Sequence, residues 1–120
     1  MMNDKELLEL AAKAAGIEVE WKEVTRSRIA EFKIIKHTKH CGFFAKGKEW
    51  NPLTDDGDAL RLAVKLHINI EIWNVDTLIG ANIYLMGRGH GYFQERYTTD
   101  PYAATRRAIV RAAAEIGKGE

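Results

Sequence analysis

The sequence has 120 residues, 46% of them apolar, with a formal net charge of +1 and one cysteine. This length fits a single domain, residues 1–120, with enough apolar content for a packed core. The near-neutral charge excludes a global field for nucleic acid or anionic membrane, and a lone cysteine excludes an intrachain disulfide. The opening MMNDKELLEL does not resemble a signal peptide, and no apolar run reaches the ~20 residues that span a bilayer. We expect a protein of the cytoplasm with no membrane partner.

The first half of the chain predicts one helix followed by strands. Asn3 suits a helix N-cap, apolar residues then recur at helical spacing, and Gly16 is a natural stop. Residues 17–24 alternate apolar and charged side chains, which is typical of a half-buried strand. Residues 29–35 form a second predicted strand, and the apolar run 41–45 is expected to close a hairpin after HTKH.

The second half predicts two further helices around three strands. One helix starts near Thr54 or Asp55, and its predicted buried face is Ala59, Leu60, Ala63, Val64 and Leu66. Strands follow at 68–73, 81–86 and 92–97, joined by a turn at 75–80 and a flexible GRGHG connection at 87–91. The last helix has Asp100 as N-cap and Pro101 at its first position, its predicted buried face includes Tyr102, and it ends at Gly117.

The order α-β-β-(β)-α-β-β-β-α places consecutive strands next to each other with short connections, which favours an antiparallel sheet. Three amphipathic helices must then cover this sheet. Helices on both faces would give a three-layer α/β/α sandwich, and helices on one face would give two layers. The predicted class is α+β, with a mostly antiparallel sheet.

Three segments resemble one known family: NDKELLELAAKAAGI, WNPLTDDGDALRLAVKL and DPYAATRRAIVRAAAEIGK. Together they are similar to the phage ABA sandwich domain family of small proteins from tailed temperate phages and prophages. The resemblance covers roughly half of the chain, and its central block is the most specific part. It implies a three-layer α/β/α sandwich fold. Members mostly lack an assigned activity, so the resemblance brings no catalytic residues.

Two clusters invite a metal interpretation. Asp55, Asp56 and Asp58 lack the spacing of a calcium loop, so we interpret them as helix-starting groups. His37, His40 and Cys41 have zinc-binding side chains, but His40 and Cys41 would point to opposite faces of a strand. We expect neither a metal site nor a cofactor.

The GRGHG segment is a candidate ligand site. Glycine lets a backbone approach an anion, and arginine and histidine can pair with phosphate. The candidate ligand-binding residues are Arg88, His90, Tyr92 and Trp50. A plain glycine-rich hairpin turn explains the same residues without a ligand. Trp50 is either a core residue buried under the second helix or an aromatic residue exposed to a partner.

Basic residues are concentrated between Lys22 and Lys48, a stretch that contains eight lysines and arginines and only two glutamates. Such a surface can hold phosphates, and interleaved phenylalanines can stack on bases. The candidate nucleic-acid-binding residues are Lys33, Lys36, Lys39 and Lys46. The alternative is a solvated ribbon whose lysines protect a strand edge. Arg107 and Arg111 share a helix face, which is either solvated or directed at an acidic partner.

The sequence contains no catalytic constellation, so we expect function by binding. The family resemblance suggests a phage accessory protein that interacts with a host protein or counters host defence. One alternative is a nucleotide or nucleic-acid binder that uses the basic stretch and the GRGHG loop. Another is a small hydrolase with His90 or His40 as its base. An edge strand or a helix face can also support a homo-oligomer.

Overall fold

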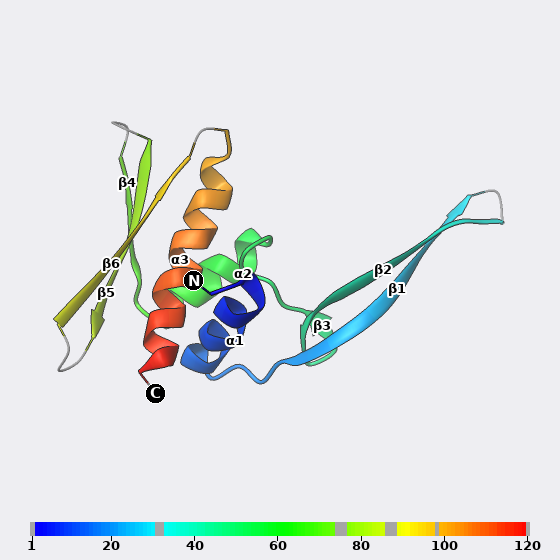
Figure 1. Cartoon of the computed structure of the whole chain (residues 1–120), viewed down its shortest axis with the longest axis horizontal. Coiled ribbons are helices and arrows are strands. Elements are labelled where there is room, and N and C mark those ends of the chain that lie inside the picture. Colours follow the sequence, from blue (N-terminus) through cyan, green and yellow to red (C-terminus); the bar gives the residue numbers. More distant parts are fainter. Residues whose placement is uncertain (1, 31–32, 74–76, 86–88, 98, 120) are drawn as a thin grey trace. The chain divides into compact units, whose positions relative to one another are not determined.

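The computed structural model describes residues 2–30, 33–73, 77–85, 89–97 and 99–119. The chain divides into two compact units, which we call the ribbon unit (Val19–Trp50) and the helical unit (Met1–Glu18 with Asn51–Glu120). The described elements are three helices and two three-stranded antiparallel sheets, in the order α1, β1, β2, β3, α2, β4, β5, β6, α3 (Figure 1). This confirms the α+β class and the predicted order of elements. The strands form two sheets, one in each unit.

The ribbon unit is a long two-stranded ribbon, β1 (Glu20–Ala30) and β2 (Lys33–Ala45), with the two-residue β3 (Lys48–Glu49) added at one end (Figure 1). β1 and β2 stay in antiparallel register along their length, apart from one shift between Arg28 and Ile29. Between β2 and β3 the turn residues Lys46 and Gly47 both have positive φ, at 52° and 79°, as a tight hairpin turn requires.

The predicted strand boundaries in this region were wrong, because the predicted strand 29–35 and the run 41–45 do not form separate strands. Residues 37–40 lie inside β2, and residues 41–45 are its last part. The physical reason is visible in the sequence. Residues 24–30 and 33–41 contain no glycine, proline, asparagine or aspartate, so neither stretch favours a turn and both strands continue.

The helical unit contains α1 (Asp4–Ala15), α2 (Asp56–Lys65) and α3 (Pro101–Lys118). The predicted N-caps Asn3 and Asp100 are confirmed, and Asp55, one of the two residues predicted to start the second helix, is its N-cap. Each of the three accepts a hydrogen bond from a backbone N–H of the first turn. Gly16 ends α1 in the left-handed conformation, with φ 69°, as expected of a C-cap glycine. The end of α3 differs from the prediction, because Gly117 lies inside the helix.

The second sheet has the strand order β4 (Asn69–Ile72), β5 (Leu78–Leu85), β6 (Gly89–Arg96). α3 packs on β5 and β6, and α1 and α2 pack on α3 (Figure 1). The core between them contains Ile79, Ala81 and Ile83 of β5 and a row of small residues on α3. None of the helices among the described residues is both long and apolar enough to cross a bilayer.

Candidate functional site

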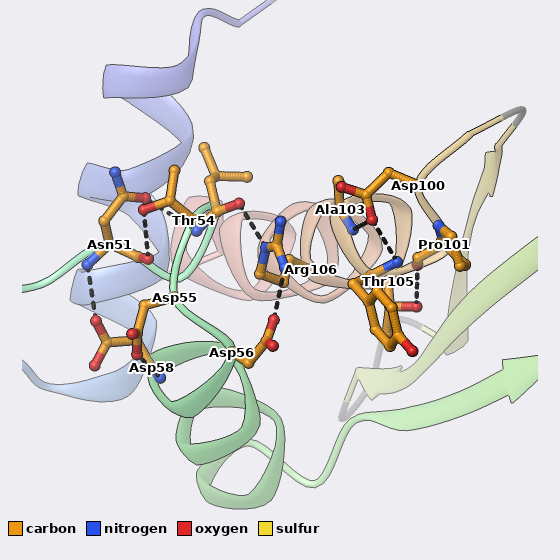
Figure 2. A network of polar contacts seen from close by, with 12 residues as sticks. Asn51, Thr54, Asp55, Asp56, Asp58, Asp100, Pro101, Ala103, Thr105 and Arg106 are labelled. Carbon is orange, nitrogen blue, oxygen red and sulfur yellow. Dashed lines mark hydrogen bonds and ion pairs between the residues drawn. The ribbon is translucent and has the colours of Figure 1, made fainter.

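The candidate site lies next to the chain corner that precedes α2. Asn51 organises this corner: its side-chain oxygen accepts from Leu53 N at 3.0 Å, and its carbonyl accepts from Asp55 N at 2.9 Å. Asp58 returns from the first turn of α2 to accept from Asn51 N at 3.0 Å (Figure 2). The NPLTDDGD segment, residues 51–58, is therefore a corner closed by its own hydrogen bonds.

Arg106 ties this corner to α3. Its Nε donates to the Leu53 carbonyl at 2.8 Å, and its Nη1 donates to Asp56 Oδ1 at 2.6 Å (Figure 2). Asp55 is the N-cap of α2 and accepts from Asp58 N at 2.8 Å. The three carboxylates thus start a helix and bind an arginine, as the helix-starting interpretation expects. No cluster of three potential metal ligands occurs among the described residues.

An apolar pocket of about 280 Å³ lies beside Asp56 and Arg106. We call it the α2–α3–β4 groove, because residues of these helices and strand line most of it. Its lining residues are Asp56, Ala59, Leu60, Ile70, Ile72, Ile79, Pro101, Tyr102, Thr105, Arg106 and Ile109. Its charged and aliphatic hydroxyl groups already have partners, because Asp56 binds Arg106 and the Thr105 hydroxyl donates to the Pro101 carbonyl at 2.7 Å.

Large apolar side chains are exposed at this groove. Ile72 is 72% exposed, Tyr102 70% and Leu60 61%. Leu60 and Tyr102 were expected on buried helix faces, and those two expectations were wrong. Isolated exposed apolar residues are ordinary on protein surfaces, but a cluster around a concave surface indicates a binding site. The groove can bind an apolar group, and none of the described residues that line it is a histidine, cysteine or lysine that could support acid–base or nucleophilic chemistry.

Of the predicted ligand residues, the two whose side chains the structure describes, Tyr92 and Trp50, do not line this groove. Tyr92 is 40% exposed and lies over Gly80, where an added β-carbon would come within 2.4 Å of the Tyr92 hydroxyl oxygen. Trp50 belongs to the ribbon unit and is 7% exposed, so its ring is buried rather than presented to a partner. Arg88 lies outside the described residues. So does the side chain of His90, whose backbone pairs with Tyr84 in β6.

The predicted nucleic-acid residues all belong to the ribbon unit. Lys33 and Lys36 are paired in β2 with Ala30 and Arg28, while their side chains lie outside the described part. Lys39 is exposed, with its Nζ 3.8 Å from a Glu23 carboxylate oxygen. Lys46 is exposed in the turn before β3.

The side chains of His40 and Cys41 in β2 contact different neighbours. The His40 ring forms a short contact with the Glu49 carboxylate of β3, whereas Cys41 Sγ lies 3.9 Å from a Glu23 oxygen of β1. This divergence agrees with the expectation that they occupy opposite faces. The side chain of His37 is outside the described part of the structure.

Arg107 and Arg111 both reach Glu95 of β6. Arg107 also binds Asp4 of α1 at 3.1 Å, and the Arg111 guanidinium lies 5.6 Å from the centre of the Phe93 ring. These arginines therefore join α3 to the sheet and to α1, a role that the shared helix face in the sequence did not reveal.

Sequence reasoning missed the groove as a site. The signal was present as a surplus of apolar residues: Ile70 and Ile72 on the strand, Leu60 on one helix and Tyr102 on another. Each fits an ordinary amphipathic pattern, so only their convergence in space shows that they are left uncovered.

No family model, curated protein or solved structure matches this chain. The resemblance to the phage ABA sandwich domain family therefore stays a prediction from the three sequence segments that carry it.

Proposed function

We propose that this chain is a small phage or prophage accessory protein that works by binding a host protein, with a role in host interaction or in countering host defence. The α2–α3–β4 groove is the proposed docking surface. The observation that carries this proposal is the exposure of Ile72, Tyr102 and Leu60 around one concave apolar surface. Such clusters on a small protein are typical of protein–protein contact.

The chemistry of the groove supports binding over catalysis. Its charged groups are engaged with one another, and its remaining surface is mostly aliphatic and aromatic. A large aromatic and neighbouring aliphatic side chains are the groups that anchor most protein interfaces. Arg106 and Asp56 are the charged residues among the groove's described lining.

Expression of the tagged protein in a bacterial host, followed by affinity capture and phage-restriction assays, tests this proposal. The informative pair of variants is Leu60→Lys and Val64→Lys. Both residues are exposed on α2 one turn apart, but only Leu60 lines the groove. We expect Leu60→Lys to lose the captured host protein and the effect on restriction, and Val64→Lys to keep both. Equal behaviour of the two variants, or no partner for the wild type, would contradict the proposal.

One observation favours a second candidate, nucleic-acid binding by the ribbon unit. Residues 19–50 contain eight basic and four acidic residues, a formal charge of +4, whereas the rest of the chain has ten basic and thirteen acidic residues, or −3. This asymmetry concentrates positive charge on a two-stranded ribbon, a form that can enter the major groove of DNA. Binding to duplex oligonucleotides should weaken steeply with salt and with alanine at Lys33, Lys36 and Lys39. Affinity indifferent to both changes would exclude it.

A further inference from the structure

β4 presents unpaired backbone groups along one side. Trp73 N donates to the Leu78 carbonyl at 2.9 Å, and these two residues face each other in the β4–β5 register. Hydrogen-bonded and non-hydrogen-bonded pairs alternate along an antiparallel ladder. Ile70 and Ile72 therefore direct their N–H and C=O groups away from β5, toward the free edge. Within the described part of the chain, no other strand pairs with this edge.

The same two residues line the α2–α3–β4 groove with their side chains. A strand added to β4 would pair its backbone with Ile70 and Ile72. Since neighbouring strands carry their side chains in the same pleat, the paired residues would direct their side chains to the groove face, next to those of Ile70 and Ile72. Backbone pairing and apolar contact would thus occur together at one position.

The opposite edge of this sheet is protected. Ile79 and Ala81 direct their backbone groups toward β6, where they face Glu95 and Phe93. Gln94 lies between these two residues, so its own N–H and C=O point away from β5, to the outer edge of β6. There the Gln94 carbonyl accepts a hydrogen bond from Arg111 Nη1 at 2.9 Å, and the neighbouring Arg96 adds an exposed charge. Charged groups of this kind prevent strand addition. The β4 edge, with Ile72 72% exposed, has no comparable cover among the described residues.

Glu71 determines which charge is favourable in a strand that pairs with β4. It lies between Ile70 and Ile72, on the opposite face of β4, where its Oε1 accepts from Asn82 Nδ2 at 2.7 Å. No described lysine or arginine forms an ion pair with it. A basic side chain directly across from Glu71 would be favourable, whereas an acidic one would be repelled. A second copy of β4 that used both isoleucines would place two Glu71 side chains opposite each other, which disfavours self-pairing.

We propose that a partner protein adds an extended segment to β4 as a fourth strand, with a lysine or arginine between two apolar residues. The apolar residues enter the groove and the basic residue faces Glu71. This inference rests on the proposed function, because it specifies what occupies the proposed docking surface.

A synthetic peptide tests the inference directly. The probe is a fluorescent, end-blocked pentapeptide with lysine at the centre, valine on each side and threonine at the ends, and anisotropy measures its binding to the full chain. We expect saturable binding, and binding roughly tenfold weaker when the central lysine is replaced by glutamate. With the Glu71→Lys protein this preference should invert. N-methylation of the two valine nitrogens should abolish binding, since it removes the backbone donors while leaving the protein unchanged.

A pair of proline variants supplies the matched protein control. Ile72→Pro removes an outward N–H of β4, and Gln94→Pro removes an outward N–H of β6. Neither N–H belongs to the ladder with β5, so both variants should keep the circular dichroism of the wild type. Only Ile72→Pro should lose the peptide.

Four results would overturn the inference. They are an absence of peptide binding, unchanged binding of the N-methylated peptide, a charge preference that Glu71→Lys does not invert, and a dimer in sedimentation velocity that Ile72→Pro dissolves. The last result would make a second copy the occupant. Loss of strand addition with intact host capture through Leu60 would overturn this binding mode and leave the proposed function standing.

Discussion

Gly117 offers the sharpest test of how the helical unit is packed. It lies in the last turn of α3, where glycine is the least favourable residue apart from proline, so helix propensity predicts that Gly117→Ala stabilises the protein by about 1 kcal/mol. The packing predicts the opposite. A β-carbon at this position would lie 2.1 Å from the backbone oxygen of Leu10 in α1, about 1 Å closer than the ~3.3 Å at which such atoms ordinarily meet.

The magnitude follows from what has to move. The contact is with backbone, so no side-chain rotation relieves it, and either α1 or the end of α3 must shift. α1 is held by five buried residues, namely Leu7, Leu8, Ala11, Ala12 and Ala15. Overpacking a core costs about 1–3 kcal/mol even where side chains can adjust, so about 3–4 kcal/mol is reasonable for a rigid helix contact. After the gain in helix propensity, we expect a net destabilisation of about 2–3 kcal/mol.

Thermal unfolding followed by circular dichroism measures this effect. A loss of 2–3 kcal/mol corresponds to a Tm lower by about 8–12 °C for a domain of this size. Gly57→Ala in α2 is the matched control, because its β-carbon would meet only side-chain groups, the Arg61 guanidinium at 3.2 Å and the Asp55 carboxylate at 3.3 Å, instead of backbone. We expect Gly57→Ala to leave the Tm unchanged or raise it. A Gly117→Ala protein as stable as the wild type would show that the close approach of α1 and α3 does not constrain the fold.

Substitutions at three further positions test individual structural features by thermal or urea unfolding. Asp100→Ala should cost about 1 kcal/mol, because Asp100 caps α3 by accepting from two backbone N–H groups, and Asp100→Asn should restore most of the loss. Glu95→Ala should cost about 1–2 kcal/mol, since Arg107 and Arg111 then lose a shared, partly buried carboxylate, and 1 M salt should leave most of this difference in place. His67→Gly should stabilise by about 1 kcal/mol, because His67 has φ 55° after α2, and an unchanged Tm would mean that this conformation is not strained.

Features determined by adjacent residues could be predicted from the sequence. The caps Asn3 and Asp100 were identified, and the start of α2 was placed at Thr54 or Asp55, because a short polar side chain followed by acidic or proline residues satisfies free N–H groups within the same turn. The stop at Gly16 follows from the same local chemistry. These contacts span three or four residues, so the tertiary structure hardly affects them.

Features determined by packing between distant segments could not be predicted. Gly117 was expected to end α3, whereas its lack of a side chain permits the approach of α1 from more than 100 residues away. Tyr102 and Val64 fit the apolar faces of their helices, yet they are 70% and 67% exposed. Periodicity shows which face of an element is apolar, but it does not show whether another element covers that face.

The origin of the groove follows from simple dimensions. Three strands spaced about 4.8 Å apart, with their side chains, present a surface wider than the ~10 Å diameter of one helix. α3 packs on β5 and β6, and α2 packs on α3, so the helical face of β4 is left partly uncovered. Only three residues, Leu66, His67 and Ile68, separate α2 from β4, which leaves little chain with which to bring α2 across that strand. The exposed Ile72 is therefore a consequence of topology, and an added strand or helix would complete the layer.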